Sequence, residues 1–245
     1  QDKPAYENDV EGRLRHEVDN LFKIGQRLCF GRTRGYFPIL CNETAVPDLK
    51  RSLVTPAAIE KSLKKVTNID FSAFFRESVY HENNSNNPMT YIIMKSALPD
   101  IILLPTCGSR GVMWQEISGR VKASPARFIF PIFTDENLDN LMASTIAKFR
   151  WELSKNVSGS VGNRAFDKSL YSEFTDYIQT YKKNRHLSAD MKEKIRLQID
   201  RKRNNVGEIF TEDYLTWINY ESRGLLRLNK VVRGILFKYC PFSKP

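Results

Sequence analysis

The sequence is poor in the residues from which metal centres and disulfide frameworks are built. It contains four cysteines and three histidines in 245 residues, and no two cysteines stand in a CxxC spacing. Structural zinc sites need four clustered cysteine or histidine ligands, so we expect no metal and no cofactor. Isolated cysteines are typical of a reducing compartment, which favours a cytoplasmic, intracellular protein. The cysteines are Cys29, Cys41, Cys107 and Cys240.

Long apolar runs and familiar catalytic motifs are also lacking. No apolar stretch approaches the roughly 18 residues that a membrane-spanning helix needs, so the sequence predicts no transmembrane segment. The Walker loop, the GxGxxG dinucleotide fingerprint, the hydrolase motif GxSxG and the zinc-protease motif HExxH do not occur in the chain. These absences favour a protein that is not an enzyme, and they leave any catalytic residues unknown.

Positive charge, by contrast, is in excess and lies mainly at one end. The chain carries a formal net charge of +10. From Lys182 to Pro245 there are 15 Lys and Arg against 7 Asp and Glu, which gives +8 and leaves +2 for the other 181 residues. A basic part of this kind predicts an anionic partner, such as nucleic acid, a membrane surface or an acidic protein surface.

Local patterns predict a mixed α/β part over residues 1–134. A helix is expected over residues 8–27, where apolar residues recur at spacings of three and four. A second helix starts at Thr55 and Pro56, because threonine can cap a helix and proline suits its first turn. The segment 70–81 is ambiguous, and its aromatic residues fit a helical face slightly better than a strand.

Three apolar runs predict the strands of a small sheet. Tyr91–Met94 and Ile101–Leu104 are rich in isoleucine and leucine and are bounded by prolines. The third run, Arg127–Phe133, contains Pro131, and proline in a sheet is confined to edges and strand ends. We therefore expect this run to be an edge strand, or to end at the proline.

From residue 135 onward the pattern is helical, which predicts a basic helical part over residues 135–245. One helix is expected through Leu141–Leu153, and short loops between the later helices suggest antiparallel packing. A segment rich in glycine and serine, residues 156–163, is a candidate hinge. The later helices are expected at about 167–183, 188–204, 211–220 and 225–239.

Together these patterns predict an α+β fold, in which a small mixed sheet with helices packs against a C-terminal half of about five helices. The two parts can share one continuous core. Because the chain begins at Gln1 and stops after Pro245, we interpret it as a fragment of a longer protein.

The first candidate site is a glycine-rich loop after the strand Ile101–Leu104 and before a possible helical turn at 112–117. Backbone N–H groups in such a loop can hold an anion, and Arg110 can add a bidentate contact to a phosphate or carboxylate. The simpler interpretation is a tight turn in which two glycines supply positive φ. The loop residues are Cys107, Gly108, Ser109, Arg110 and Gly111.

Acidic and histidine residues flank this loop and could form an acid–base set around a phosphate ester. They are Asp100, Glu116, and the neighbours His81 and Glu82. Their spacing along the chain does not by itself bring them together.

The second candidate site is a basic helical surface. Lysine and arginine on one face of a helix make sequence-independent, salt-sensitive contacts to phosphates. The alternative is a solvated helix face, where long basic side chains are common. The surface comprises Lys182, Lys183, Arg185, Lys192, Arg196, Arg201, Lys202 and Arg203.

Two hypotheses of function follow. In the first, the chain is a non-catalytic interaction or regulatory module of a larger intracellular protein, and its basic helical surface engages an anionic partner. In the second, it is an enzyme or sensor that binds a phosphate-bearing small molecule at residues 106–111. The sequence favours the first, because the charge asymmetry involves many residues and no catalytic signature accompanies the loop.

Overall fold

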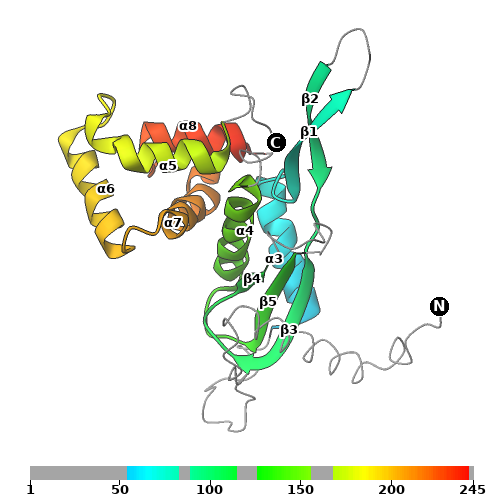
Figure 1. Ribbon diagram of the computed structural model, residues 1–245. Coiled ribbons are helices and arrows are strands. Elements are labelled where there is room, and N and C mark those ends of the chain that lie inside the picture. Colours follow the sequence, from blue (N-terminus) through cyan, green and yellow to red (C-terminus); the bar gives the residue numbers. More distant parts are fainter. Residues whose placement is uncertain (1–53, 83–88, 115–125, 156–167, 243–245) are drawn as a thin grey trace, which may run out of the picture.

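The computed structural model describes residues 54–82, 89–114, 126–155 and 168–242, and it confirms the α+β fold (Figure 1). In these ranges the elements are a β-hairpin, a three-stranded sheet, six α-helices and two short 3₁₀ helices. The helix expected at 8–27 and the hinge expected at 156–163 lie outside the described residues. None of the helices described here is long and apolar enough to cross a membrane.

Helix α3 (Pro56–Ile69) begins where the sequence predicts it. The Thr55 side chain accepts a hydrogen bond from the backbone N–H of Ala58 at 3.1 Å, and the proline occupies the first turn. The helix ends when the N–H of Asp70 donates to the carbonyl of Val66. This end places the carboxylate of Asp70 inside the protein, where it becomes important below.

The helical preference expected for residues 70–81 is wrong, because most of this segment is a strand. Strand β1 (Phe75–Glu82) pairs antiparallel with β2 (Met89–Ser96), in a register that runs from Phe75 opposite Ser96 to Glu82 opposite Met89. The hydrogen bonds to a partner strand decide the conformation here. A local spacing pattern contains no information about that partner.

The second sheet is mixed and has the strand order β3–β5–β4. Strand β3 (Asp100–Cys107) runs parallel to β5 (Arg127–Phe133), and β4 (Val112–Trp114) runs antiparallel to it. The strand prediction for residues 127–133 is confirmed, but β5 is central rather than an edge. The helical turn expected at 112–117 is also wrong, since β4 begins there.

Pro131 is tolerated in this central strand because β4 is short. Strand β4 pairs only with residues 127–129 of β5, so the proline lies beyond the end of that ladder. Past the proline, the N–H of Val54 donates to the carbonyl of Ile132 at 2.7 Å. Beyond the end of β4, a backbone carbonyl on the open edge of β5 therefore finds its hydrogen-bond donor in the segment that leads into α3.

The described residues of the C-terminal half form five α-helices, as the sequence predicts. Helix α7 starts earlier than expected, because Asn205 caps it, and α8 starts later, because Asn229 accepts hydrogen bonds from its first turn. Helix α6 crosses from the end of α5 to the start of α7 rather than packing along either helix (Figure 1). The five are α4 (Leu138–Lys155), α5 (Leu170–Thr180), α6 (Ala189–Arg201), α7 (Val206–Asn219) and α8 (Lys230–Tyr239).

Helix α4 lies at the centre and is buried on opposite sides. Toward the sheet, Phe149 meets Phe128 of β5 edge to face, with ring centroids 5.4 Å apart. Toward the helices, Trp151 stacks on Phe210 of α7 at 5.3 Å. One set of buried apolar side chains extends from Val54 to the end of α8, so the mixed and helical parts share a continuous core.

A buried ion pair joins the two parts at this core. Arg150 of α4 lies 3.4 Å from the carboxylate of Asp70, and both side chains are almost fully shielded from water. The hydroxyl of Tyr214 donates to Asp70 at 2.7 Å, and the guanidinium of Arg150 donates to the Cys240 thiol and the Tyr239 carbonyl. The cluster therefore ties the end of α3 to α4, α7 and the end of α8.

Burial and charge act against each other on the groups of this cluster. Burial is the largest single effect and would by itself lower the pKa of Arg150. The interactions with Asp70, Cys240 and Tyr214 together outweigh it, and the pKa is raised. Burial raises the pKa of the Cys240 thiol to about 12. Arg150 therefore stays charged and Cys240 stays protonated at neutral pH.

We predict that Asp70→Asn destabilises the protein by about 3–5 kcal/mol, because it leaves the Arg150 charge buried without a counter-charge. The measurement is urea unfolding followed by circular dichroism. The control is Glu60→Gln, which removes a carboxylate from the exposed pair with Lys64 and should leave the midpoint nearly unchanged. Equal midpoints for the two variants would contradict the role of the ion pair.

Candidate functional site

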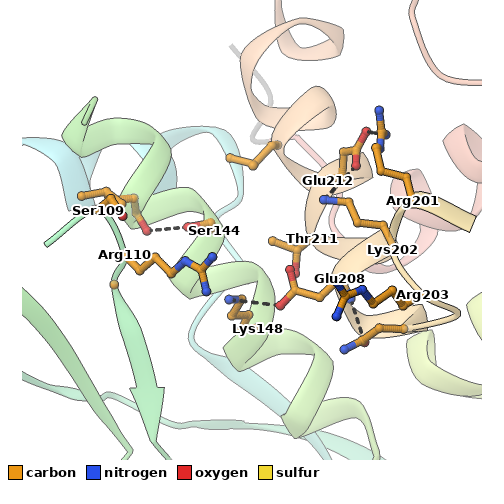
Figure 2. Close-up of a pocket in the computed structure, with 14 residues that line it drawn as sticks. Ser109, Arg110, Ser144, Lys148, Arg201, Lys202, Arg203, Glu208, Thr211 and Glu212 are labelled. Carbon is orange, nitrogen blue, oxygen red and sulfur yellow. Dashed lines mark hydrogen bonds and ion pairs between the residues drawn. The ribbon is translucent and has the colours of Figure 1, made fainter. Parts of the chain in front are cut away.

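A cleft of about 710 Å³ opens between the loop after β3 and the corner that joins α6 to α7 (Figure 2). One wall is formed by residues 109–111 together with α4. The opposite wall is formed by residues 201–203 and the first turns of α7. The cleft thus contains residues of both candidate sites that the sequence indicates separately.

Positive charge dominates the lining of the cleft. The basic residues are Arg110, Lys148, Arg201, Lys202 and Arg203, and the acidic ones are Glu208 and Glu212. Both carboxylates are already paired. Glu208 lies 3.2 Å from Lys148 across the α4–α7 interface, and Glu212 bonds both Arg201 and Lys202. Five cations against two anions give the lining a formal charge of +3.

Arg110 and Arg203 stand apart from these pairs. Among the described residues, neither guanidinium has an acidic side chain within ion-pair distance. Figure 2 shows them on opposite sides of the cleft, with the Lys148–Glu208 pair between them. Their planar donor groups suit phosphate and carboxylate oxygens, so they are the residues best placed to receive an anion.

Close packing fixes the loop that carries Arg110. At Gly111, an added Cβ atom would lie 2.3 Å from Thr145 Oγ1 and 2.7 Å from Phe130 Cε1. Glycine is thus required by the approach of the loop to α4 and β5. The positive φ expected for Gly108 and Gly111 is wrong. In the described ranges, the one glycine with positive φ is Gly224.

Arg203 is held in an unusual backbone conformation. Helix α6 ends through Arg203 and Asn204, whose φ angles are 51° and 59°. This left-handed region suits glycine and asparagine, and it costs other residues about 1–2 kcal/mol. The turn closes when the N–H of Asn204 donates to the carbonyl of Ile199 at 3.0 Å. An arginine at this position is a local cost to stability.

The rest of the predicted basic surface lies outside the cleft. Arg196 is bonded to Glu193 and Asp200 of its own helix, and α6 as a whole carries four cations and three anions, a net charge of +1. This helix face is therefore less basic than the sequence suggests. The predicted residues that do not line the cleft are Lys182, Lys183, Arg185, Lys192 and Arg196.

Of the flanking acid–base set, only Asp100 can be placed, and it lies at the far end of β3 from the loop. Asp100 opens β3, whereas the loop follows the last residue of that strand, Cys107. Seven residue steps of extended chain separate Asp100 from Cys107 by roughly 23 Å. Glu116 and the side chains of His81 and Glu82 lie outside what the structure describes. In the described ranges, no three His, Cys, Asp or Glu side chains are grouped to hold a metal ion.

One part of the cleft comes from helix packing and has no signal in the local sequence. Lys148 and Glu208 lie on α4 and α7, far apart in the chain and in otherwise ordinary helical patterns. Each residue follows helical spacing, but the pairing of the two helices is a property of the fold. No signal in the local sequence could have placed them beside Arg110.

A buried carboxyl group supports the corner that carries Arg203. Asp213 of α7 accepts a hydrogen bond from the Gln198 side chain of α6 at 2.9 Å. Burial raises the pKa of Asp213 to about 7; the Gln198 bond lowers it and the neighbouring Glu212 raises it. The contact between α6 and α7 therefore contains a group that titrates near neutral pH.

Comparison with known proteins adds one match. A family model described as "Domain of unknown function (DUF8509)" matches residues 161–245, about a third of the chain. No curated protein and no solved structure matches the chain. The matched segment includes α5 to α8 and the wall of the cleft with Arg203, whereas Arg110 and α4 lie outside it.

We predict that Arg203→Gly raises the free energy of unfolding by about 1 kcal/mol, because glycine adopts the left-handed conformation without strain. Urea unfolding measures the change. Asn204→Gly is the matched control, and it should give a smaller gain, since asparagine already tolerates this region. A loss of stability in Arg203→Gly would show that the arginine serves the fold.

We predict that the carboxyl group of Asp213 makes stability depend on pH. Its pKa is near 7 in the folded chain and about 3.9 when unfolded. The stabilisation that this group adds to the free energy of unfolding is therefore fully present below about pH 4. Between about pH 4 and 7 it falls by roughly 1.4 kcal/mol per pH unit, and it is lost as pH rises through 7. In urea unfolding from pH 5 to 8, the free energy of unfolding should fall less steeply with pH for Asp213→Asn than for the native chain. Identical slopes would contradict the raised pKa of Asp213.

Proposed function

We propose that this chain is a non-catalytic binding module that engages an anionic partner through the cleft between the β3–β4 loop and the α6–α7 corner. The observation that carries the proposal is the pair of arginines, Arg110 and Arg203, which face the same cleft without acidic partners among the described residues. Each comes from a segment that the sequence marks independently as anion-binding.

Electrostatics supports an anion as the partner. The lining carries a formal charge of +3 on side chains that are exposed or partly exposed to solvent, and an excess of one sign in a cleft attracts ions of the other sign. Anions are also attracted by the N-terminal end of α7, whose cap residue, Asn205, lines the cleft. Long-range attraction of this kind raises the rate of encounter and weakens as salt is added.

The composition of the lining supports binding rather than catalysis. Its titratable groups are arginine, lysine and two glutamates that are held in ion pairs. The described lining contains no histidine or cysteine, the residues that most often supply general bases and activated nucleophiles. Fixed cations and hydroxyl groups can hold an anion, and they do not by themselves supply a proton transfer.

The test compares two double variants that lose the same charge. Arg110→Gln with Arg203→Gln removes two cations from the cleft, and Lys182→Gln with Lys183→Gln removes two from the basic surface outside it. We expect the first to weaken binding of a fluorescent oligothymidylate at low salt by on the order of tenfold or more, and the second to change it much less. Fluorescence anisotropy gives the dissociation constants.

The opposite ranking would move the binding surface to residues 182–183, and equal losses would show that net charge alone matters. Circular dichroism of each variant checks the fold. Both arginines are exposed, so their replacement should leave the core intact.

A further inference from the structure

We propose that the anion held in the cleft is a phosphate monoester carried by a small molecule. This inference rests on the function proposed above and names its ligand. Two guanidinium groups line opposite walls of the cleft (Figure 2), so a ligand that engages both must present oxygen atoms in both directions.

The number of oxygens separates the possible anions. An arginine fork binds two oxygens of one group through parallel N–H donors. A carboxylate has two oxygens and is fully used by one fork. A phosphate monoester has three terminal oxygens and a charge near −2, so Arg110 and Arg203 can each engage two of them by sharing one. Two arginines on facing walls therefore match a phosphate monoester better than a carboxylate.

The remaining cations of the cleft are already compensated. Lys148 is paired with Glu208, and Glu212 bonds both Arg201 and Lys202. A ligand that bound mainly to these three would first have to displace a carboxylate. The unpaired arginines can receive an anion without such a loss, which concentrates recognition on one group of the ligand.

The size of the cleft suits a small molecule. A volume of about 710 Å³ lies within the range of small-ligand sites, roughly 300–1,000 Å³. A phosphate group occupies the space of a few water molecules of about 30 Å³ each, so most of the cleft remains for the body of the ligand. Leu141 and Leu215 provide apolar contacts there.

The surroundings of the cleft argue against a polymer. A nucleic-acid strand needs cations that continue along its backbone. Beyond the cleft, Arg196 of α6 is bonded to Glu193 and Asp200, and α6 carries a net charge of only +1. Along α6, the positive charge beyond the cleft is thus largely compensated within the helix.

The arginine residue itself carries part of the inference. Arg203 occupies a left-handed position where glycine would be more stable. Lysine would supply the same charge, but as a compact ammonium without the planar fork. A site that needs charge alone tolerates lysine, whereas a site that binds phosphate through forks does not.

The experiment uses matched probes and matched variants of the full 245-residue chain. Phenyl phosphate and benzoate share an aromatic body and differ in the anionic group, and AMP and adenosine differ by the phosphate. Isothermal titration calorimetry compares the native chain with the Arg110→Lys/Arg203→Lys and Arg110→Gln/Arg203→Gln variants and with the Lys182→Gln/Lys183→Gln control.

We expect phenyl phosphate and AMP to bind, and benzoate and adenosine to bind at least tenfold more weakly. The lysine double variant should lose on the order of tenfold in affinity for phenyl phosphate, although its charge is unchanged. The Lys182/Lys183 control should bind as the native chain does.

Other outcomes separate the inference from the proposed function. If the lysine double variant binds phenyl phosphate as tightly as the native chain while the glutamine variant does not, charge suffices and the phosphate-monoester inference is overturned. Binding of oligothymidylate without binding of the small phosphates would overturn the small-molecule ligand and leave the proposed function standing. Equal binding of every probe by the glutamine variant and the Lys182/Lys183 control would overturn both.

Discussion

The Arg150–Asp70 ion pair is the constraint on which the arrangement of the two halves depends. Removing two charges from water is costly, and only well-placed partners offset the cost. Here those partners come from four places in the chain: Asp70 after α3, Arg150 on α4, Tyr214 on α7 and Cys240 after α8. Because these contacts form only when the elements are correctly docked, the pair specifies one relative position of the sheet layer and the helical layer.

The cleft lies at the outer end of the same α4–α7 interface. Lys148 is two residues before Arg150, and Thr211 is three residues before Tyr214. Nearby, a Cβ atom at Gly207 would come within 2.8 Å of Trp151 Nε1, so α7 also approaches α4 closely at its start. Rigid packing on both sides therefore holds the two walls at a fixed separation. A binding site gains affinity from such preorganisation, because little order has to be created when the ligand arrives.

The sequence predicts elements whose signals are local. The start of α3 could be predicted from Thr55 and Pro56, and the helices of the C-terminal half from their apolar spacing. Prediction failed where pairing with another strand decides the conformation. Strand β1 forms because β2 pairs with it. Pro131 fits a central strand because β4 is too short to reach it. The cleft has the same character. Arg110 and Arg203 were each indicated by local sequence, but their presence in the lining of one cleft depends on the tertiary fold.

Counting charges along the sequence identified the basic half of the chain but not the place where its charge is available. On α6, Arg196 is compensated by Glu193 and Asp200. At the corner after α6, Glu212 compensates Arg201 and Lys202, and the strained Arg203 is left over. Arg203 strains the backbone, which lowers the stability of the folded chain. If the cleft binds an anion as we propose, that binding would stabilise the folded state and offset the cost of placing an arginine where glycine would fold better.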